Sequence, residues 1–341
     1  MSTESTTAPT LQDIAREAGV SLATASRVLN GSTRTVAESY RERVEAAAAR
    51  LGYTANLSAQ ATARGTSAVI ALFVADIADP YFAQVAAGVA RGADEAGLLV
   101  TISTTGRDPE RETRLVRAVR GQRPRGIILA ASRADRPGTD LLRAELAAVA
   151  RLGSRVVALG PGADDDVRSV VIDNRGGARA LAGALAQRGY RTAIVLAAAE
   201  GVRTSDDRLA GFTEGFVAGG GRIERILRGD FSRDSGRQLA DVALAAGIAP
   251  GTLVFGISDV VAIGALTALR SAGREIGTDL ALAGFDDIPT SRDVTPGLTT
   301  VRVPLEEVGY RALRAAIDEE WAAGEDLGLE VVLRESTPER R

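Results

Sequence analysis

The feature that most restricts the fold is an alternation of short apolar runs with helical stretches, which begins at Ala68 and continues almost to the end of the chain. Repeated strand–helix units build parallel sheets that helices cover on both faces. Helical stretches at 80–96, 175–188 and 258–271 separate several of the runs. The runs that favour strands are "AVIALFVA", "LLVTIS", "GIILAAS", "RVVALG", "SVVID", "TAIVLAA", "TLVFG" and "LALAG".

These strands are too many for one small sheet, and the segment "GADDD" at 162–166 offers a break between two groups. We therefore predict an α/β region of two Rossmann-like lobes with a cleft between them. In such folds, the carboxyl ends of the strands and the loops that follow them present the groups that bind a ligand.

The N-terminal region has a different, all-helical pattern. After a tail over 1–9 that we expect to be disordered, Thr10 starts a helix over 11–18 with a pattern similar to a capping box. Gly19 ends this helix, and Ser21 caps a second one that ends near "NG". A third stretch, "AESYRERVEAAAARLGY", places an apolar stripe on one helix face. Three short helices with a tight glycine turn between the first two are typical of a helix-turn-helix domain.

Composition excludes several classes of function. The chain has no Cys and no His, which removes disulfides, thiolate metal sites and the most common general base. The start "MSTESTTAPT" lacks the basic and apolar regions of a signal peptide, and no apolar run reaches membrane-spanning length. We therefore expect a cytoplasmic protein that uses no metal or cofactor and has no membrane partner.

Charge is a weaker indicator of function. The net charge is −3, and all 41 basic residues are Arg. Between Arg27 and Arg64, however, six Arg face only three acidic residues, so a local basic surface that attracts DNA is compatible with the sequence.

The second predicted helix is small and polar where a core helix would be apolar. The recognition helix of a helix-turn-helix enters the major groove with its N-terminal side chains near the base edges. Hydroxyl groups can bond phosphates, Arg27 can pair with guanine or phosphate, and Leu22 and Ala23 can pack against thymine methyl groups. The alternative is an ordinary helical hairpin at the surface.

The stretch "LQDIAREAGVSLATASRVLNG" resembles the DNA-binding signature of the lactose-repressor/galactose-repressor (LacI) family. The resemblance continues in order through "LGYTAN", "DIADPYFAQVAAGVARGADEAG", "VVIDNRGGARAL", "DRLAGF", "SDVVAIGAL" and "LALAGFDDIPTSRDVTPGLTTVRVPLEEVG". It implies a homodimeric transcription factor, usually a repressor, which binds a pseudo-palindromic operator in double-stranded DNA. It further implies a sensor of the periplasmic-binding-protein-like fold, type I, which binds a small molecule, most often a sugar.

The resemblance also assigns residues to DNA. Thr62 stands where the family usually carries a Leu that wedges into the minor groove, and Tyr40 stands where a Thr usually contacts phosphate. Both departures predict an altered operator geometry. The residues that match operator contacts or the approach to the hinge are Ser21, Leu22, Ala23, Thr24, Ser26, Arg27, Asn30, Tyr53 and Asn56.

In the sensor, Arg208 matches an Arg that grips effector hydroxyls or carboxylates, and Asp286 matches an acceptor from the other side of the pocket. The alternative for these two is a salt bridge between loops. Ser258 stands where the family often has Asn, and Gly160 where an acidic ligand group is common. Three aromatic residues are expected to form walls of the pocket, with core packing as the alternative for each: Tyr81, Phe82 and Phe231.

The expected domains follow from these assignments. A helix-turn-helix domain over 10–56 is followed by a hinge helix or linker over 57–67 and a sensor over 68–338. The first lobe comprises about 68–167 plus 298–324, and the second about 168–297 plus 325–338. The chain ends in "ERR" without a heptad tail, so we expect a dimer rather than a tetramer.

Two other classes of protein share parts of this pattern. A solute-binding protein that serves a transporter has the sensor fold, but it needs an export signal and leaves the helix-turn-helix unexplained. An enzyme of sugar or nucleotide metabolism would have to rely on carboxylates, Ser, Tyr or Arg, because His and Cys are absent.

Overall fold

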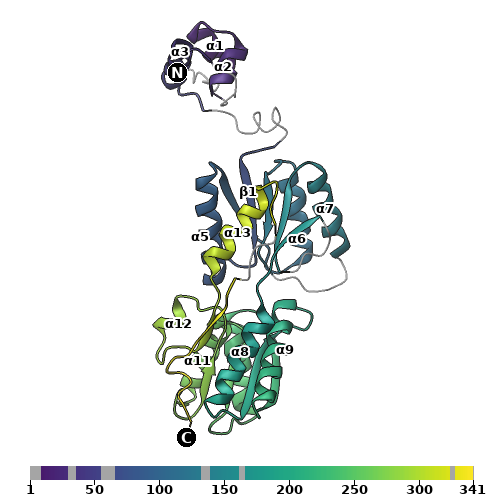
Figure 1. The fold of residues 1–341 in the computed structure, drawn as a ribbon, viewed down its shortest axis with the longest axis vertical. Coiled ribbons are helices and arrows are strands. Elements are labelled where there is room, and N and C mark those ends of the chain that lie inside the picture. Colours follow the sequence, from purple (N-terminus) through teal and green to yellow (C-terminus); the bar gives the residue numbers. More distant parts are fainter. Residues whose placement is uncertain are drawn as a thin grey trace, which may run out of the picture. The chain divides into compact units, whose positions relative to one another are not determined.

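The computed structural model describes residues 9–29, 36–54, 66–131, 139–160, 166–322 and 327–340. The chain divides into two compact units, Met1–Ala68 and Val69–Arg341, which Figure 1 colours along the sequence from purple to yellow. The predictions for Asn30, Asn56 and Thr62, for the tail before Pro9 and for most of the hinge lie outside the described residues.

Three helices form the first unit: α1 (Leu11–Ala18), α2 (Leu22–Leu29) and α3 (Glu38–Leu51). The Thr10 hydroxyl accepts the backbone N–H of Asp13, whose carboxylate accepts the N–H of Thr10, so the expected capping box is present. The apolar faces of the three helices meet in one small core, made of Ile14, Ala15, Ala18, Ala25, Val44 and Ala47. The three predicted helices are confirmed.

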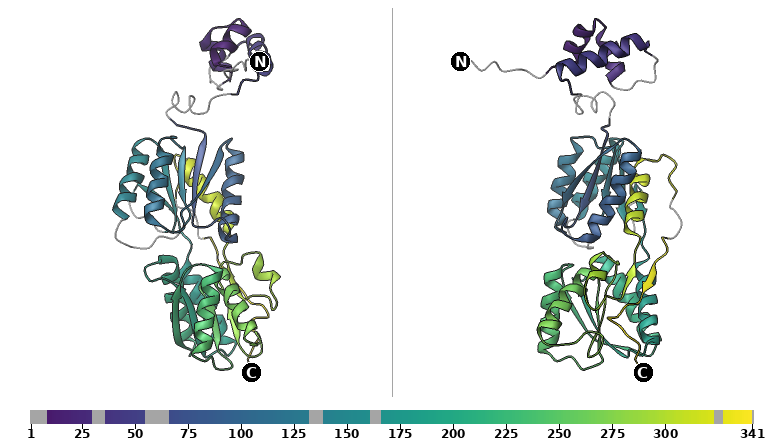
Figure 2. Two further views of the ribbon diagram at one scale, coloured as in Figure 1. Left: turned by 180° about the vertical axis from the view of Figure 1, so that it is seen from behind. Right: turned by 90° about the vertical axis from the view of Figure 1, so that its left-hand side faces the viewer.

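The first lobe of the second unit is a five-stranded parallel sheet in the order β2-β1-β3-β4-β5. Helices α5 and α13 cover one face, and α6 and α7 cover the other (Figures 1 and 2). Phe73 of β1 packs in the cluster on the α6 and α7 side, as successive strand residues face opposite sides. The bounds are β1 Val69–Val74, α5 Pro80–Glu95, β2 Leu99–Thr104, α6 Pro109–Arg120, β3 Gly126–Leu129, α7 Thr139–Arg151, β4 Arg155–Leu159 and β5 Val167–Val170.

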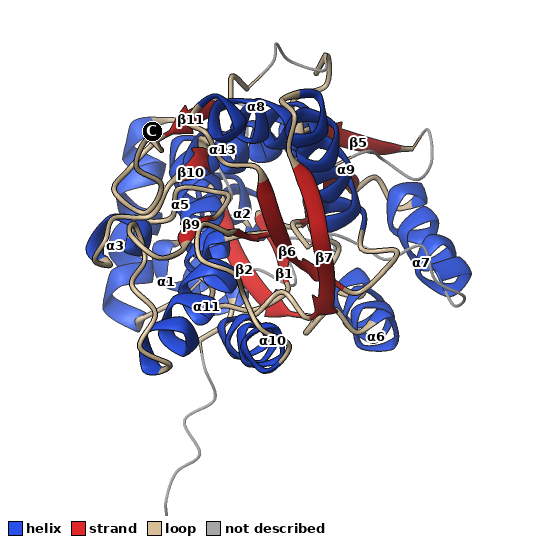
Figure 3. Cartoon of the chain, turned by 90° about the horizontal axis from the view of Figure 1, so that it is seen from below, coloured by secondary structure: helices blue, strands red, loops and turns tan. Residues whose placement is uncertain are grey.

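The second lobe is a four-stranded parallel sheet in the order β7-β6-β8-β9. Figure 3 shows α8 and α9 on one face of this sheet and α10 and α11 on the other. The elements are α8 Asn174–Gln187, β6 Thr192–Ala198, α9 Arg203–Ala218, β7 Arg222–Gly229, α10 Arg233–Ala245, β8 Leu253–Gly256, α11 Asp259–Ser271 and β9 Ala281–Ala283.

The chain passes between the lobes after β5, after β10 (Thr300–Arg302) and again before β11 (Glu330–Val332), with a short helix α12 (Thr290–Asp293) before β10. Helix α13 (Leu305–Ile317) returns to the first lobe. A Cβ on Gly88 of α5 would lie 1.8 Å from the Glu306 carbonyl oxygen, so the two helices touch backbone to backbone at this glycine.

Two predicted lobe boundaries shift in the structure. Strand β5 pairs with β4 in the first sheet, so the crossing expected at 167/168 follows Val170 instead. Strand β10 pairs with β11, and its Arg302 bridges to Asp286 of the second lobe, so the return expected at 298 follows β10. Backbone pairing decides both positions, and apolar content alone does not reveal it.

Candidate functional site

The exposed face of α2 carries most of the described residues expected to contact DNA. The Ser21 hydroxyl caps α2 by accepting the Thr24 backbone N–H at 3.1 Å, and it lies 2.8 Å from the Thr24 hydroxyl. Ala25 is buried in the core, so the face of α2 that carries Ala25 points inward and the face that carries Ser21 and Leu22 points outward. The side chains of Ser21, Leu22, Ala23 and Arg27 are exposed, whereas those of Thr24 and Ser26 are half-buried.

Charge on this helix favours an anionic partner, because α2 contains Arg27 and no acidic residue. Arg43 of α3 donates hydrogen bonds to the carbonyl oxygens of Ala18 and Gly19, so this guanidinium ties α3 to the C-terminus of α1. Its Cζ atom lies 5.7 Å from the exposed ring of Tyr40. Tyr53 packs against the helical core, so part of its role is structural.

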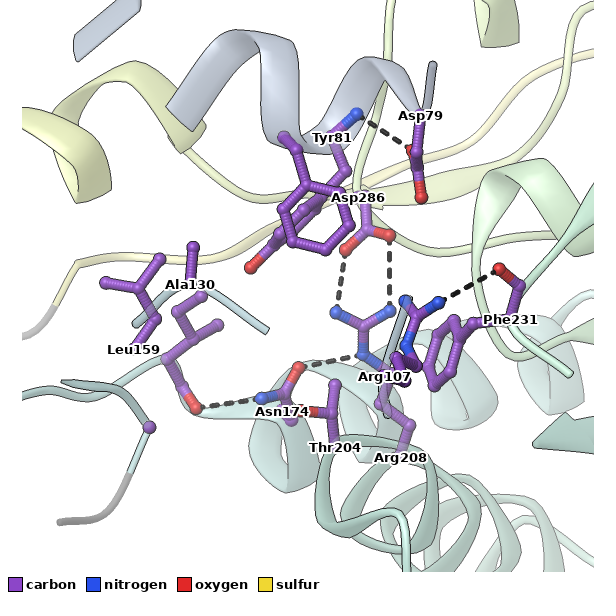
Figure 4. A pocket seen from close by; sticks show the side chains of 13 residues that line it. Asp79, Tyr81, Arg107, Ala130, Leu159, Asn174, Thr204, Arg208, Phe231 and Asp286 are labelled. Carbon is purple, nitrogen blue, oxygen red and sulfur yellow. Dashed lines mark hydrogen bonds and ion pairs between the residues drawn. The ribbon is translucent and has the colours of Figure 1, made fainter. Parts of the chain in front are cut away.

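A pocket with about 520 Å³ of free space, including the part open to solvent, lies between the two lobes of the second unit (Figure 4). This is within the size range of small-molecule sites. The first lobe contributes Asp79, Tyr81, Phe82, Arg107, Ala130, Leu159 and Gly160. The second lobe and the crossing that leads to it contribute Ile172, Asn174, Thr204, Arg208, Phe231 and Asp286.

A buried ion pair between Arg208 and Asp286 forms the floor of this pocket. Arg208 of α9 donates to both oxygens of Asp286 at 2.7 and 3.2 Å, and the two side chains are 2% and 5% exposed. Arg208 also donates to the Ile257 carbonyl oxygen and to Asn174 Oδ1, and its Cζ lies 3.9 Å from the Phe285 ring centroid. The expectation that Asp286 faces Arg208 from the other side of the pocket is wrong, because both belong to the second lobe and pair directly.

Burial raises the pKa of Asp286 to about 6, against the opposing effect of Arg208. Behind it lies Asp259, fully buried at the start of α11, where burial together with the nearby Asp286 raises the pKa to about 8. Asp259 accepts hydrogen bonds from the Thr300 hydroxyl at 2.6 Å and from the Ile288 N–H at 2.9 Å. This carboxyl therefore connects the turn after β9 with α11 and β10.

The N-terminus of α5 forms the opposite wall. Asp79 caps this helix by accepting the Tyr81 N–H at 3.0 Å, and burial raises the pKa of its carboxyl. The rings of Tyr81 and Phe82 meet edge to face with centroids 5.0 Å apart, and burial raises the pKa of the Tyr81 phenol. Phe82 is 3% exposed, so it belongs to the core and to the pocket wall at once.

Of the remaining residues that the sequence assigns to the pocket, some line it and Ser258 does not. Phe231 lines the pocket as expected, and Gly160 lines it without a side chain, at a φ of +116°. Ser258 does not line it: this residue is the N-cap position of α11, and its buried hydroxyl has no hydrogen-bond partner within the described part of the chain. The lining residues that the sequence did not suggest are Asp79, Arg107, Asn174 and Thr204, all at the carboxyl ends of strands or in the elements that follow them.

Two further observations concern other kinds of site. None of the described helices is long and apolar enough to span a bilayer. Over the same residues, no three Asp or Glu side chains are grouped so that they could hold a metal ion. Most of the acidic segment 162–166 lies outside the described residues.

Known proteins match both units. Residues 10–56 match the family of bacterial regulatory proteins of the lacI type, and residues 182–337 match the periplasmic binding protein-like domain. The transcriptional regulator CelR of Thermobifida fusca is 32% identical over 91% of each chain. The repressor CytR of Escherichia coli K12 is 30% identical over 92% of this chain and 90% of its own.

The chain belongs to the LacI family. A solved structure of the lac repressor dimer with operator and the anti-inducer ONPF covers 97% of this chain and 100% of its own, at 27% identity and a TM-score of 0.81. The predicted family and fold class are therefore confirmed, and this LacI-family chain is a DNA-binding transcriptional regulator. The relatives are transcriptional regulators rather than solute-binding proteins or enzymes.

Proposed function

We propose that this chain is a repressor that binds a pseudo-palindromic operator as a homodimer and releases or engages it when a carbohydrate-class molecule occupies the pocket between the lobes. Two relatives support the assignment of partners. The lac repressor is solved as a dimer on operator DNA, and CelR is solved in complex with cellobiose. We further propose that the pocket binds its ligand without converting it.

The single observation that carries the DNA-binding part is the exposed N-terminal turn of α2. Leu22 is 51% exposed although it is a large apolar residue, and Ser21, Ala23 and Arg27 are exposed beside it. No acidic residue of α2 would repel phosphate. We assign base discrimination to Leu22, Ala23 and Arg27, and phosphate contacts to Ser21 and Thr24. The roles of Ser26, Asn30, Tyr53, Asn56 and Thr62 in DNA binding are part of the same proposal.

The pocket supports control by a ligand, because its walls come from both lobes. A small molecule that contacts Tyr81 of the first lobe and Arg208 of the second has a different affinity for open and closed lobes, and this difference is what shifts a conformational equilibrium. We propose Tyr81, Phe82, Phe231, Arg208 and Asp286 as effector-binding residues. A coupling of about 1–3 kcal/mol between effector and operator is typical of linked sites.

Selection of bound duplexes from a random pool tests the role of α2. We expect Leu22→Gln to select a different base at one position of each half-site, since one good base contact is worth about 1–3 kcal/mol of discrimination. The matched control is Val242→Gln on α10, because Val242 is 54% exposed and lies in the other unit. The proposal fails if the Leu22 variant and the control select the same sequence with equal preference.

A second measurement tests the pocket. Incubation of the protein with candidate sugars should shift its melting temperature and its operator affinity, and NMR of the recovered sugar should show no new product. Conversion of the sugar would contradict the proposal of a non-catalytic sensor.

A further inference from the structure

Arg107 is the feature of the pocket that the proposed function leaves unexplained. It follows β2 in the first lobe, and its guanidinium lies beside Phe231 of the second lobe (Figure 4). Its Nε–H is buried and has no acceptor among the described residues. Within that part of the chain its guanidinium makes a single hydrogen bond, a long one of 3.5 Å from Nη1 to the Phe231 carbonyl oxygen. A guanidinium offers five N–H donors, so most of its capacity is unused here.

Arg107 also has no counter-ion within the part of the chain that the structure describes, because no carboxylate oxygen of that part lies within 4.0 Å of its nitrogens. Arg208, the other cation of the pocket, is paired with both oxygens of Asp286. Burial lowers the pKa of Arg107, against the opposing effects of Asp79, Asp230 and Asp76, which act on it from beyond ion-pair distance.

Asp79 lies on the same, first-lobe side of the pocket as Arg107, and the two groups interact electrostatically although they form no ion pair within 4.0 Å. One of its carboxylate oxygens accepts the Tyr81 N–H, and the other has no hydrogen bond from a described residue. The first-lobe side of the pocket thus presents an acceptor suited to a hydroxyl group and a fork of donors suited to an anion.

The backbone and the aromatic rings hold Arg107 in this position. Its φ is +56°, in the left-handed region that few residues other than glycine adopt, and its N–H donates to the Thr105 hydroxyl at 3.3 Å. Such a conformation persists where the surroundings enforce it, often at functional sites. The Cζ atom lies 5.0 Å from the Phe231 ring centroid and 5.9 Å from that of Phe82, within the range of cation–π contacts.

We propose that the effector of this protein is a hydroxylated anion, a sugar acid or a sugar phosphate, whose charged group binds Arg107 and one of whose hydroxyls donates to Asp79. The inference rests on the proposed function and specifies its ligand. A neutral sugar offers Arg107 only hydroxyl dipoles, whereas a carboxylate or phosphate pairs with this half-buried guanidinium at close range and fills two of its donors.

Matched probes test this directly. Glucose, galactose and ribose are each used as the free sugar, as the corresponding sugar acid and as the phosphate monoester, and binding to the full chain is measured by titration calorimetry. We expect one acid or phosphate to bind at least about tenfold more tightly than its neutral counterpart, from the strength of charged hydrogen bonds. Which of the two classes binds distinguishes a sugar acid from a sugar phosphate.

Variants then assign the preference to Arg107. Arg107→Gly removes the side chain and accepts the left-handed backbone without strain, so it is the variant most certain to fold. It should weaken the anionic probe about ten- to hundredfold and its neutral counterpart far less. Arg107→Lys should retain part of the preference. Arg111→Gln is the matched control, since Arg111 is an exposed arginine nearby that does not line the pocket, and it should change neither affinity.

Three results overturn the inference. If neutral sugars bind as tightly as the charged probes, the ligand is neutral and the proposed function stands. If Arg107→Gly weakens neutral and charged probes by the same factor, Arg107 only holds the lobes together. If no charged probe binds at millimolar concentration to protein that still binds operator DNA, the effector is not of this class. Failure of the wild-type chain to bind operator DNA would instead refute the proposed function itself.

Discussion

Replacing Arg208 with methionine should destabilise the second unit strongly and in a pH-dependent way. The substitution removes both hydrogen bonds to Asp286, the bonds to Ile257 and Asn174, and the stacking on Phe285. Since the two charged side chains are only 2% and 5% exposed, solvent cannot take over the pairing. Breaking a buried pair from one side costs about 3–5 kcal/mol.

This energy converts into a melting temperature. The unit Val69–Arg341 has roughly 270 residues, and an unfolding entropy of about 2.1 cal/mol/K per residue gives about 0.57 kcal/mol/K. Arg208→Met should therefore lower the melting temperature of this unit by about 5–9 °C at neutral pH, measured by calorimetry. The double variant Arg208→Met/Asp286→Asn should recover about 1–3 kcal/mol, because no unpaired charge remains buried.

The pH dependence distinguishes an ion pair from simple packing. Arg208 lowers the pKa of Asp286, so its removal should move that pKa above about 6. Below this pH the lone carboxyl can take up a proton and lose its charge, and the cost of Arg208→Met should shrink there and be largest above it. Equal costs at pH 5 and pH 8, or a loss below about 1 kcal/mol, would show that the pair does not hold this lobe together.

Three further predictions concern other parts of the chain. Gly88→Ala should destabilise the protein by more than about 3 kcal/mol or block folding, because its Cβ would lie 1.8 Å from the Glu306 carbonyl oxygen. The matched control is Gly183→Ala in α8, whose Cβ would have no atom within 4 Å; in a denaturant titration this variant should be more stable than the wild type by about 0.5–1 kcal/mol. In the wild type, the raised pKa of Asp259 should make stability fall as the pH rises toward about 8, since the folded state binds the carboxyl proton more tightly than the unfolded state. Asp259→Asn should therefore reduce the dependence of the melting temperature on pH between pH 6 and 8. An unchanged dependence would show that another group titrates in this range. Arg27→Ala should reduce discrimination between operator and non-operator DNA by about 1–3 kcal/mol without changing the melting temperature, and unaltered discrimination in a gel-shift titration would remove Arg27 from the base contacts.

Much of the fold could be predicted because burial on both faces leaves a clear pattern. All eight apolar runs overlap strands of the two sheets, although "SVVID" includes only the last two residues of β5, and the helix expected at 80–96 is α5. Strand β7 is absent from the predicted strands because it lies at the edge of its sheet, where half-buried and exposed positions alternate and Arg and Glu interrupt the apolar residues of "RIERILRG".

The site was less predictable, because the role of a side chain depends on its neighbours in space. The motifs around Arg208 and Asp286 predict a role in the pocket, but the pairing of the two side chains depends on the turn after β9 meeting α9. Ser258 was assigned by its position in a motif, whereas the structure uses that position to begin α11. Arg107 is one of two arginines in "GRDPERE", and only its buried Nε–H, which has no acceptor among the described residues, distinguishes it.

The central claim is that α2 recognises DNA bases and that the pocket between the lobes controls this recognition. Sequencing of genomic fragments captured by the purified full chain, with and without small metabolites, tests it most directly. The account predicts a small set of enriched fragments that share one pseudo-palindromic sequence, and a metabolite that changes their occupancy. Enrichment of no fragment above background, in either condition, would contradict it.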